Sequence, residues 1–400
     1  MPMNVSTAAG EVASLLQALR SLRPQLAENG ARADREHADP GENMALLGDA
    51  GAARLLVPAE FGGLWEGWTF GGWGHFVKAM TEISAGDGPT GQNWGTTALV
   101  CREIFGARDA LPERTRAEIA RRVLDEGLRL VASNAEAGVA GRVTARAVRG
   151  GVVLSGTKSF NTNSGGGGLA NVGCVLEGGP GGRHHVLVEL SHPDVELHDD
   201  WDNMGQRGTC SQTVTYHDVF VPDGWHYAGV DPAPEFVGAV MLLHAALMQG
   251  IGDGALDAMV DYVRTLKRAT LPEFATAAED PLITRRIGEV SSRLAASRAL
   301  LDATAETVAQ LDNAGAEAVS QATVAAIRAK VACVEASLAA ASTVHEVSGA
   351  RSTSNRFRLD RFWRNARTFA SHDPTDTKNV YIGRYETSGE LPPISTLLRV

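Results

Sequence analysis

The centre of this chain holds the segment Ser155-Gly156-Thr157-Lys158-Ser159-Phe160-Asn161-Thr162-Asn163-Ser164-Gly165, preceded by the alternating run Val152-Val153-Leu154. The run is typical of the end of a β-strand. We expect a turn after it, carrying one aromatic ring, small polar residues and a loop rich in glycine up to Gly168. Such a segment can place a flat apolar face, a hydroxyl and several backbone N–H groups around one planar ligand.

The sequence around this segment is β-rich. Short alternating stretches are separated by glycine turns, which predicts an antiparallel barrel or sandwich. The expected strands are residues 129–132, 143–148, 151–154, 170–176, 185–190 and 213–220.

Both flanks show the helical period. Apolar residues at three- and four-residue intervals predict helices within residues 9–50, 72–105 and 112–126, with a break at Gly86-Asp87-Gly88-Pro89. The period returns in 238–268, 281–312 and 315–348, as in a helical bundle. We therefore predict an α+β fold with an N-terminal helical domain (1–127), a central β domain (128–232) and a C-terminal four-helix bundle (233–400).

Composition excludes several classes of protein. Lys and Arg number 37 against 47 Asp and Glu, and the net charge of −10 gives no basic surface for nucleic acid or an anionic membrane. The four cysteines form no C-x-x-C pair, which favours a reducing cytoplasm over a disulfide framework or a zinc site. We expect no signal peptide, and the longest apolar run, Phe236 to Met248, is too short to span a bilayer.

Two motifs match the spacing of known functional motifs but do not lie in the secondary structure that those motifs require. The glycines of Gly250-Ile251-Gly252-Asp253-Gly254-Ala255 follow a helical stretch rather than a strand, so we interpret them as sites of close helix packing and not as a dinucleotide fingerprint. Ser155 and Lys158 have the spacing of a serine acyl-enzyme, yet they follow a strand and lack the partner motifs, so a turn is favoured.

Histidines and tryptophans raise two further alternatives. Four histidines in the β region could indicate a metal site, but their spacing favours solvated side chains. These histidines are His184, His185, His192 and His198. Four tryptophans among glycines predict either core packing or an aromatic-lined pocket, and the sequence leaves both open; they are Trp65, Trp68, Trp73 and Trp94.

Near the C-terminus, Arg364 and Arg367 lie one helical turn apart and can meet a phosphate together. His372 follows at the end of this helix, which we expect Pro374 to stop. A histidine beside Asp373 is a candidate general acid or base.

Taken together, four motifs resemble the acyl-CoA dehydrogenase superfamily over nearly the whole chain. They are Val57-Pro58-x-x-Phe61-Gly62-Gly63, Gly156-Thr157-Lys158-Ser159-Phe160-Asn161-Thr162, Met204-Gly205-x-Arg207-Gly208-Thr209 with Val219-x-Val221-Pro222, and Arg364-Asn365-Ala366-Arg367. The resemblance implies the three-part fold, flavin bound between subunits, and a homotetramer or homodimer.

Within the superfamily, the segments His372 to Asp376 and Gly389 to Pro393 look more like the two-component flavin monooxygenases, such as dibenzothiophene monooxygenase. This branch implies that a separate NAD(P)H-flavin reductase supplies reduced FMN or FAD. It also implies that O2 gives a C4a-hydroperoxyflavin, which hydroxylates an electron-rich, aromatic, indole-like small molecule.

The resemblance also implies residue roles. Phe160 and Thr162 lie along the flavin edge, Asn134 and Trp201 contact the ring, and Arg268, Arg364 and Arg367 are candidates for the phosphate. His372, Thr162 and Asp373 are the candidate catalytic residues, and Gln92, Trp94 and Thr96 line the substrate pocket. Gln92 and Thr96 stand where the dibenzothiophene enzyme's branch has a His and a Tyr.

Two other functions remain open from the sequence. An acyl-CoA dehydrogenase would use Asp373 as its base, at the place where that family carries a glutamate. A non-catalytic flavin-binding homologue would bind flavin without turnover.

Overall fold

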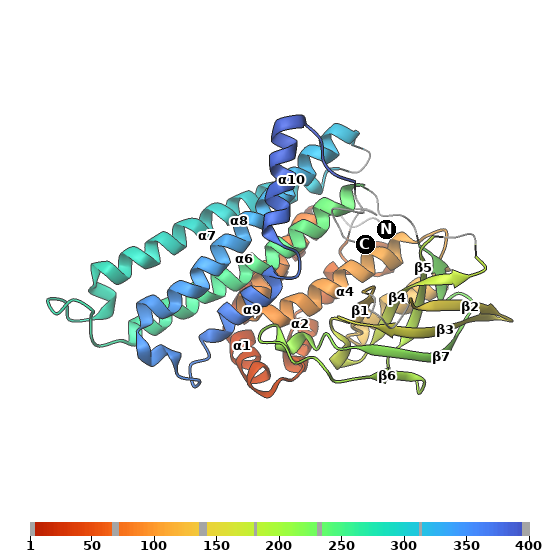
Figure 1. Cartoon of the computed structure of the whole chain (residues 1–400), viewed down its shortest axis with the longest axis horizontal. Helices are drawn as coiled ribbons and strands as arrows, with labels where there is room; N and C mark the ends of the chain where they lie inside the picture. The colour runs from red at the N-terminus through yellow and green to blue at the C-terminus, as the bar shows by residue number, and fades with distance from the viewer. Residues whose placement is uncertain are drawn as a thin grey trace.

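The computed structural model describes residues 5–65, 72–135, 142–179, 182–229, 234–311 and 314–393. Helices come first, strands occupy the middle and long helices follow (Figure 1). The helices are α1 (Val5–Glu36), α2 (Gly41–Asp49), α3 (Trp73–Gly86), α4 (Gly88–Gly106), α5 (Glu113–Asp125), α6 (Pro234–Thr265), α7 (Pro281–Val308), α8 (Ala316–Ser348), α9 (Asp360–Ala370) and α10 (Thr375–Ser388). The strands are β1 (Leu130–Ser133), β2 (Thr144–Val148), β3 (Gly151–Lys158), β4 (Leu169–Glu177), β5 (His184–Glu189), β6 (Val195–Leu197), β7 (Val214–Pro222) and β8 (His226–Ala228). The predicted α+β class is confirmed, while the three domain boundaries stay a prediction.

The strands of the described chain form one sheet in the order β6-β7-β3-β2-β4-β5-β8, with β1 paired to β4. The sheet is not wholly antiparallel as predicted, because β4 runs parallel to both β1 and β2. Alternation along a strand reports which face is buried but not the direction of its neighbour, so this feature was missed. The short strands β6 and β8 were also not predicted.

The expected turn at Ser155 is wrong, because β3 continues to Lys158 beside β7. The register shifts between Leu154 and Gly156, and Gly156 has a φ of 125° with Val143 closely packed against it. A glycine accommodates this backbone without a side-chain clash. Ser155 alone stands opposite His217 and Asp218, so the extra residue of the bulge belongs to β7, and β3 continues past it. The turn begins after Lys158.

The predicted break between two helices is confirmed at Asp87. Its carboxylate accepts hydrogen bonds from the backbone N–H and the hydroxyl of Thr90, at 3.1 and 2.6 Å, which caps α4. Arg361 of α9 lies 3.6 Å from the same carboxylate. The start of α4, which supplies one wall of the site described below, is therefore fixed by both a cap and a buried charge.

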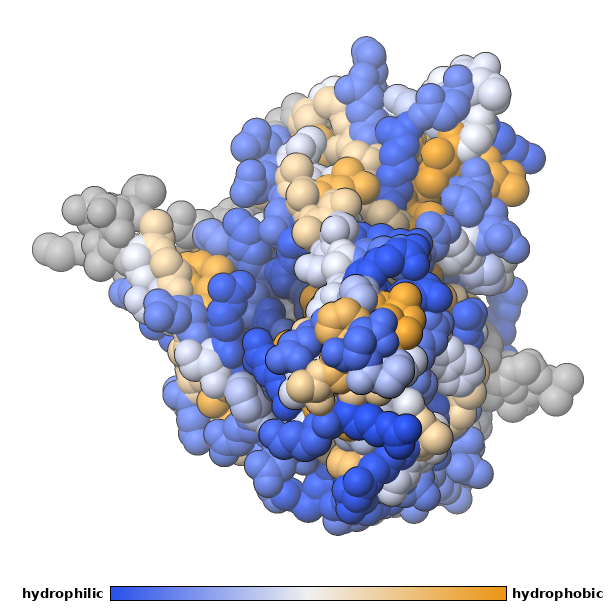
Figure 2. Space-filling model, turned by 90° about the vertical axis from the view of Figure 1, so that its left-hand side faces the viewer, coloured by the Kyte–Doolittle hydropathy of each residue, from blue (hydrophilic) through white to orange (hydrophobic). Residues whose placement is uncertain are grey.

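Three long helices, α6, α7 and α8, run side by side and form the body of the C-terminal region, with α9 and α10 packed against α8 (Figure 1). α6 has the length and apolarity of a membrane span, with a mean hydropathy of 1.4, but 78% of the apolar window is buried inside the fold. Such extensive burial is typical of the central helix of a bundle. The end of the bundle seen in Figure 2 is covered mainly by hydrophilic residues with small apolar areas between them.

The glycines of α6 act as predicted. A Cβ at Gly250 would lie 2.4 Å from the Cβ of Ser84, and one at Gly254 would lie 2.3 Å from the carbonyl oxygen of Ala85. These glycines therefore let α6 approach α3 closely, and the segment is the interior of a helix rather than a nucleotide-binding loop.

We expect Gly254→Ala to lower the free energy of unfolding by about 1–3 kcal/mol, because the added methyl group must displace backbone of α3. Gly288→Ala in α7 is the matched control, since a Cβ there has no neighbour within 4 Å and alanine favours the helix. Chemical denaturation of both variants checks this. An equal effect of the two substitutions would contradict close packing at Gly254.

Candidate functional site

Two adjoining cavities lie where the β region meets α4, α6 and the end of α9. The inner cavity has a volume of about 310 Å³, and the outer one has a volume of about 560 Å³. Both volumes fall in the range of small-molecule sites. The cavities share part of their wall, formed by Gln92, Ala135, Phe160, Thr162, Phe369 and His372.

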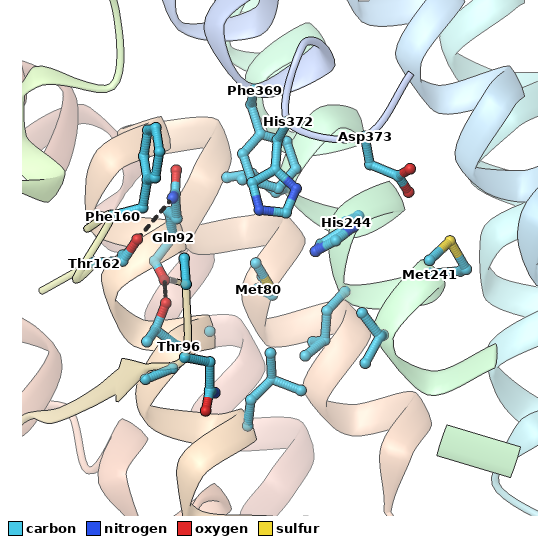
Figure 3. Close-up of a pocket in the computed structure, with 18 residues that line it drawn as sticks. Met80, Gln92, Thr96, Phe160, Thr162, Met241, His244, Phe369, His372 and Asp373 are labelled. Carbon is cyan, nitrogen blue, oxygen red and sulfur yellow. Dashed lines mark hydrogen bonds between the residues drawn. The ribbon is translucent and has the colours of Figure 1, made fainter. Parts of the chain in front are cut away.

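Hydroxyl and amide groups form a fixed network on one side of the shared wall. The Thr162 hydroxyl lies 2.9 Å from that of Ser211 and accepts from the Gln92 side chain at 3.4 Å (Figure 3). Gln206 donates to Gln92 Oε1 at 2.7 Å. Thr96 donates to the Gln92 carbonyl, so its hydroxyl is used within α4. The network holds the Thr162 hydroxyl at the boundary between the two cavities.

The loop that carries Gln206 is anchored on α9. Its backbone N–H donates to Asn365 Oδ1 at 2.7 Å, and Arg364 donates to the carbonyl of Met204 at 2.7 Å. A Cβ at Gly205 would lie 2.1 Å from the carbonyl oxygen of Arg364, so only glycine permits this contact. Two motifs far apart in the sequence therefore meet and build one edge of the outer cavity.

Phe160 presents an aromatic face in the outer cavity. Its φ of 55° is unusual for a bulky residue, and 64% of it is exposed. Its ring contacts that of Trp201 edge to face at 6.1 Å, and Trp201 in turn donates to the carbonyl of Gln206 at 3.0 Å. A strained backbone that holds an apolar ring open to a cavity is typical of a binding site for a planar ligand.

Asn134 lines the inner cavity just after β1. Its carbonyl accepts from the buried Lys158 at 3.3 Å, while its side-chain Oδ1 is buried with no hydrogen-bond partner among the described residues. This oxygen lies against β4, because a Cβ at Gly173 would come within 2.5 Å of it.

Three rings meet at the inner cavity, and two of them, Phe369 and His372, belong to the shared wall. Phe369 and His372 stack with centroids 5.5 Å apart, and His244 of α6 meets His372 edge to face at 5.2 Å. Figure 3 shows His244 beside His372. His244 was not predicted as a site residue, although a histidine within the apolar run of α6 was a visible signal.

Asp373 does not pair with His372, which corrects the predicted His–Asp arrangement. Its carboxylate forms ion pairs with Lys330 and with Lys378, the latter at 2.9 Å, and Lys330 also donates to its carbonyl. The carboxylate is turned away from the cavity centre in Figure 3. Burial alone would raise the pKa of Asp373, but the two ammonium groups hold it below its usual value.

Both histidines are neutral at pH 7. Desolvation by the surrounding protein lowers the pKa of His372, Lys330 and Lys378 lower it further, and Asp373 opposes them. Desolvation, followed by Lys330, His372 and Lys378, holds the pKa of His244 well below its usual value. Desolvation also lowers the pKa of Lys330 to about 8, against the influence of Asp373.

The three arginines predicted for a phosphate lie in different surroundings. Arg364 forms ion pairs with Asp34 at 2.6 Å and Asp360 at 2.7 Å, so it braces α9 against α1 and does not face the cavities. Arg367, one turn further along α9, is exposed and lines neither cavity. Arg268 is exposed beyond the end of α6, roughly 27 Å along the helix axis from the last cavity residue of α6.

Three of the four clustered tryptophans, Trp65, Trp73 and Trp94, lie in the core. The guanidinium of Arg102 lies over the rings of Trp65 and Trp73, at 3.4 and 5.1 Å from their centroids. Trp94 packs against Phe76 at 5.9 Å and lines neither cavity, so its assignment to the substrate pocket is wrong. The i, i+2 relation to Gln92 places Trp94 on another face of α4. Trp68 lies outside the described residues.

The remaining motifs have structural roles. Ser155 donates to Asp218 at 2.5 Å and lies on the face of β3 opposite to Lys158, so the two do not form a catalytic pair. The β-region histidines bond separately: His184 lies 3.1 Å from His226, and His198 lies 2.8 Å from Thr215.

The predicted aromatic and hydroxyl groups fit a reduced flavin. An exposed ring at Phe160, the Trp201 edge, and the Thr162 and Ser211 hydroxyls supply the apolar and hydrogen-bonding contacts that a flavin ring needs. A ring held at the shared wall would face the inner cavity, where a second molecule has room.

Comparison with known proteins gives a consistent result. A family model described as "Acyl-CoA dehydrogenase, C-terminal domain" matches residues 242–377. Dibenzothiophene monooxygenase of Rhodococcus qingshengii is 31% identical over 368 residues, covering 86% of each chain. The probable FMNH2-dependent monooxygenase SfnC of Pseudomonas putida is 29% identical, covering 93% of this chain and 94% of the relative.

A solved structure has the same fold. TdsC from Paenibacillus sp. A11-2, in complex with FMN and indole, superposes with a TM-score of 0.82 at 25% identity. The match covers 94% of this chain and 98% of that chain.

Proposed function

Because the chain belongs to the flavin-dependent monooxygenase branch of the acyl-CoA dehydrogenase superfamily and uses reduced flavin, we propose that it oxygenates an electron-rich aromatic small molecule with flavin reduced by a separate enzyme. The observation that carries the proposal is the pair of adjoining cavities, with Phe160, Thr162 and His372 in their shared wall. The outer cavity takes the flavin, and the inner one takes the substrate.

Reduced flavin, when bound, supplies the electrons with which O2 is activated. Phe160 and Trp201 orient its ring, and the Thr162 hydroxyl, held by Ser211 and Gln92, offers a hydrogen bond at its edge. The apolar lining of the inner cavity, which includes Leu99 and Leu247, excludes water from the oxygen-transfer step.

His372 is the residue of the shared wall that can move a proton at its ring nitrogens. Its imidazole is neutral at pH 7 and lies in the wall of both cavities, within reach of either ligand. Asp373 acts through Lys330 and Lys378, which fix the segment after α9, and is a positioning residue. Its two ion pairs also make it a poor base for the dehydrogenase alternative.

The choice of substrate and reductase rests on two supports. The TdsC structure holds indole beside FMN, which supports an aromatic substrate for a chain with the same fold. The glycine motif of α6 is helix interior, and the name of the relative SfnC specifies FMNH2, which together support reduction of the flavin outside this chain. We further propose a homotetramer or homodimer, in which Arg268 and Arg367 can approach the flavin of another subunit.

The proposal is tested by supplying the purified protein with FMN and an NADH-dependent flavin reductase in air, together with indoles, thiophenes, phenols and amines. Mass spectrometry is expected to show a product heavier by one oxygen atom, labelled when 18O2 is used. Anaerobic reduction of bound flavin by an acyl-CoA would instead support a dehydrogenase. Flavin binding without any product would support the non-catalytic alternative.

We expect Phe160→Ala to weaken flavin binding roughly 3- to 12-fold, since it removes the exposed ring and its contact with Trp201. Phe220→Ala is the control, because Phe220 is also exposed, at 48%, but lies on β7 away from both cavities. Equilibrium titration with FMN and FMNH2 measures both variants. Equal affinities for the two variants would contradict a flavin at Phe160.

A further inference from the structure

The imidazole of His244 is a polar group in the lining of the inner cavity. Its Nδ1 is buried with no hydrogen-bond partner among the described residues, and its ring makes only edge-to-face contacts with Phe369 and His372, both at 5.2 Å. Buried polar groups in folded proteins are normally paired, and an orphaned nitrogen beside a cavity implies a partner that enters that cavity.

The described residues around His244 give no packing reason for a histidine at this position of α6. The residues one turn earlier and about one turn later in the same cavity wall, Met241 and Leu247, are apolar. Met80 of α3 and Leu99 of α4 continue the apolar surface around it. A leucine or methionine would satisfy the packing, so the imidazole is retained at a cost in desolvation.

The charges behind the cavity restrict what its partner can be. Lys330 and Lys378 face one carboxylate, that of Asp373, so the three groups carry a net charge of +1 when both lysines are protonated. This potential opposes a cationic amine and favours a heteroatom on which negative charge builds up. Both ammonium groups pair with Asp373 and neither lysine lines the inner cavity, whereas the imidazole of His244 does.

We infer that His244 accepts a hydrogen bond from a protic group on the substrate, a ring N–H or a phenolic O–H, and so selects protic aromatics over their aprotic isosteres. The inference rests on the proposed function, because it assigns the inner cavity to the substrate. A hydrogen bond donated by the substrate to His244 also raises the electron density of the aromatic ring, which suits transfer of an electrophilic oxygen.

The position of His244 completes this assignment. It enters from α6, across the cavity from Gln92 and Thr162 (Figure 3). The ring of His244 contacts Phe369 and His372 of the shared wall, so a substrate that donates to His244 is held close to the wall where the flavin lies. His244 thereby sets which substrates bind.

Indole and benzothiophene test the inference, because they have the same ring shape and only indole carries an N–H. We expect the wild-type protein to bind indole roughly tenfold more tightly, and to show at least that preference in kcat/KM. In His244→Leu the ratio should fall to about one, while His244→Gln, which keeps an acceptor, should retain part of it. His217→Leu, on β7 away from the cavities, is the control and should leave the ratio unchanged.

Calorimetric binding of both compounds to the flavin-free protein separates failure of the inference from failure of the proposed function. Equal affinities in the wild type, or an equal loss of both in His244→Leu, overturn the role of His244. Absence of any oxygenated product from a protein that binds indole preferentially overturns the proposed function and leaves the hydrogen bond supported.

Discussion

Replacing His372 by alanine is expected to lower kcat for oxygenation by about 10²- to 10⁴-fold, the range in which a positioned general acid or base contributes. His372 is the ionisable residue in the shared wall of the two described cavities, and its side chain can exchange a proton with a ligand in either. Flavin affinity should change much less than kcat. Steady-state kinetics with saturating reduced FMN, paired with flavin titration, measures both.

His217→Ala is the control for this substitution, since His217 is exposed on β7 and pairs with Glu196 at 2.9 Å, away from the cavities. The dependence of kcat on pH provides a second test. The pKa of His372 is lowered, so its imidazole gains a proton only at a pH below the ordinary histidine pKa of about 6.5. We therefore expect kcat to fall on the acid side of that pH. A kcat that is unchanged in His372→Ala would remove His372 from the mechanism.

Asp373→Asn is expected to lower the free energy of unfolding by about 3–5 kcal/mol, because it removes the buried carboxylate that pairs with two buried lysines. The side chain of Lys378 is 1% exposed and that of Lys330 is 5% exposed, so water cannot replace the lost carboxylate. Urea denaturation followed by circular dichroism measures the change.

Arg328→Met is the matched control for Asp373→Asn. It breaks another ion pair between α8 and α10, with Glu386, but both partners are exposed, at 41% and 59%, and such a pair contributes about 0–1 kcal/mol. Equal stability of the two variants would contradict a stabilising role for the buried ion pairs of Asp373 with Lys330 and Lys378.

Local patterns were enough to predict most helices and strands, and two of the central site residues. Phe160 and Thr162 follow a strand directly, so their position at an open loop is encoded within a few residues. Trp94 was misplaced because i, i+2 residues on a helix face different directions, and a cluster of tryptophans does not reveal which of them is core. The turn expected at Ser155 became a bulge because the partner strand β7, distant in sequence, continues beside it.

By itself, the sequence determined the order of helices and strands, the superfamily, and the position of Phe160 and Thr162 directly after a strand, because apolar periodicity and short motifs are local properties of the chain. Only the tertiary structure decided the partners of the charged groups. Asp373 stands next to His372 in the chain but pairs with Lys330 and Lys378, and Arg364 turns to Asp34 rather than to a ligand. Coulombic and hydrogen-bond partners depend on distance in space, which for α1, α6, α8 and α9 is set by packing. For the same reason His244, an ordinary residue of an apolar helix in the sequence, becomes a polar group in the lining of the inner cavity in the fold.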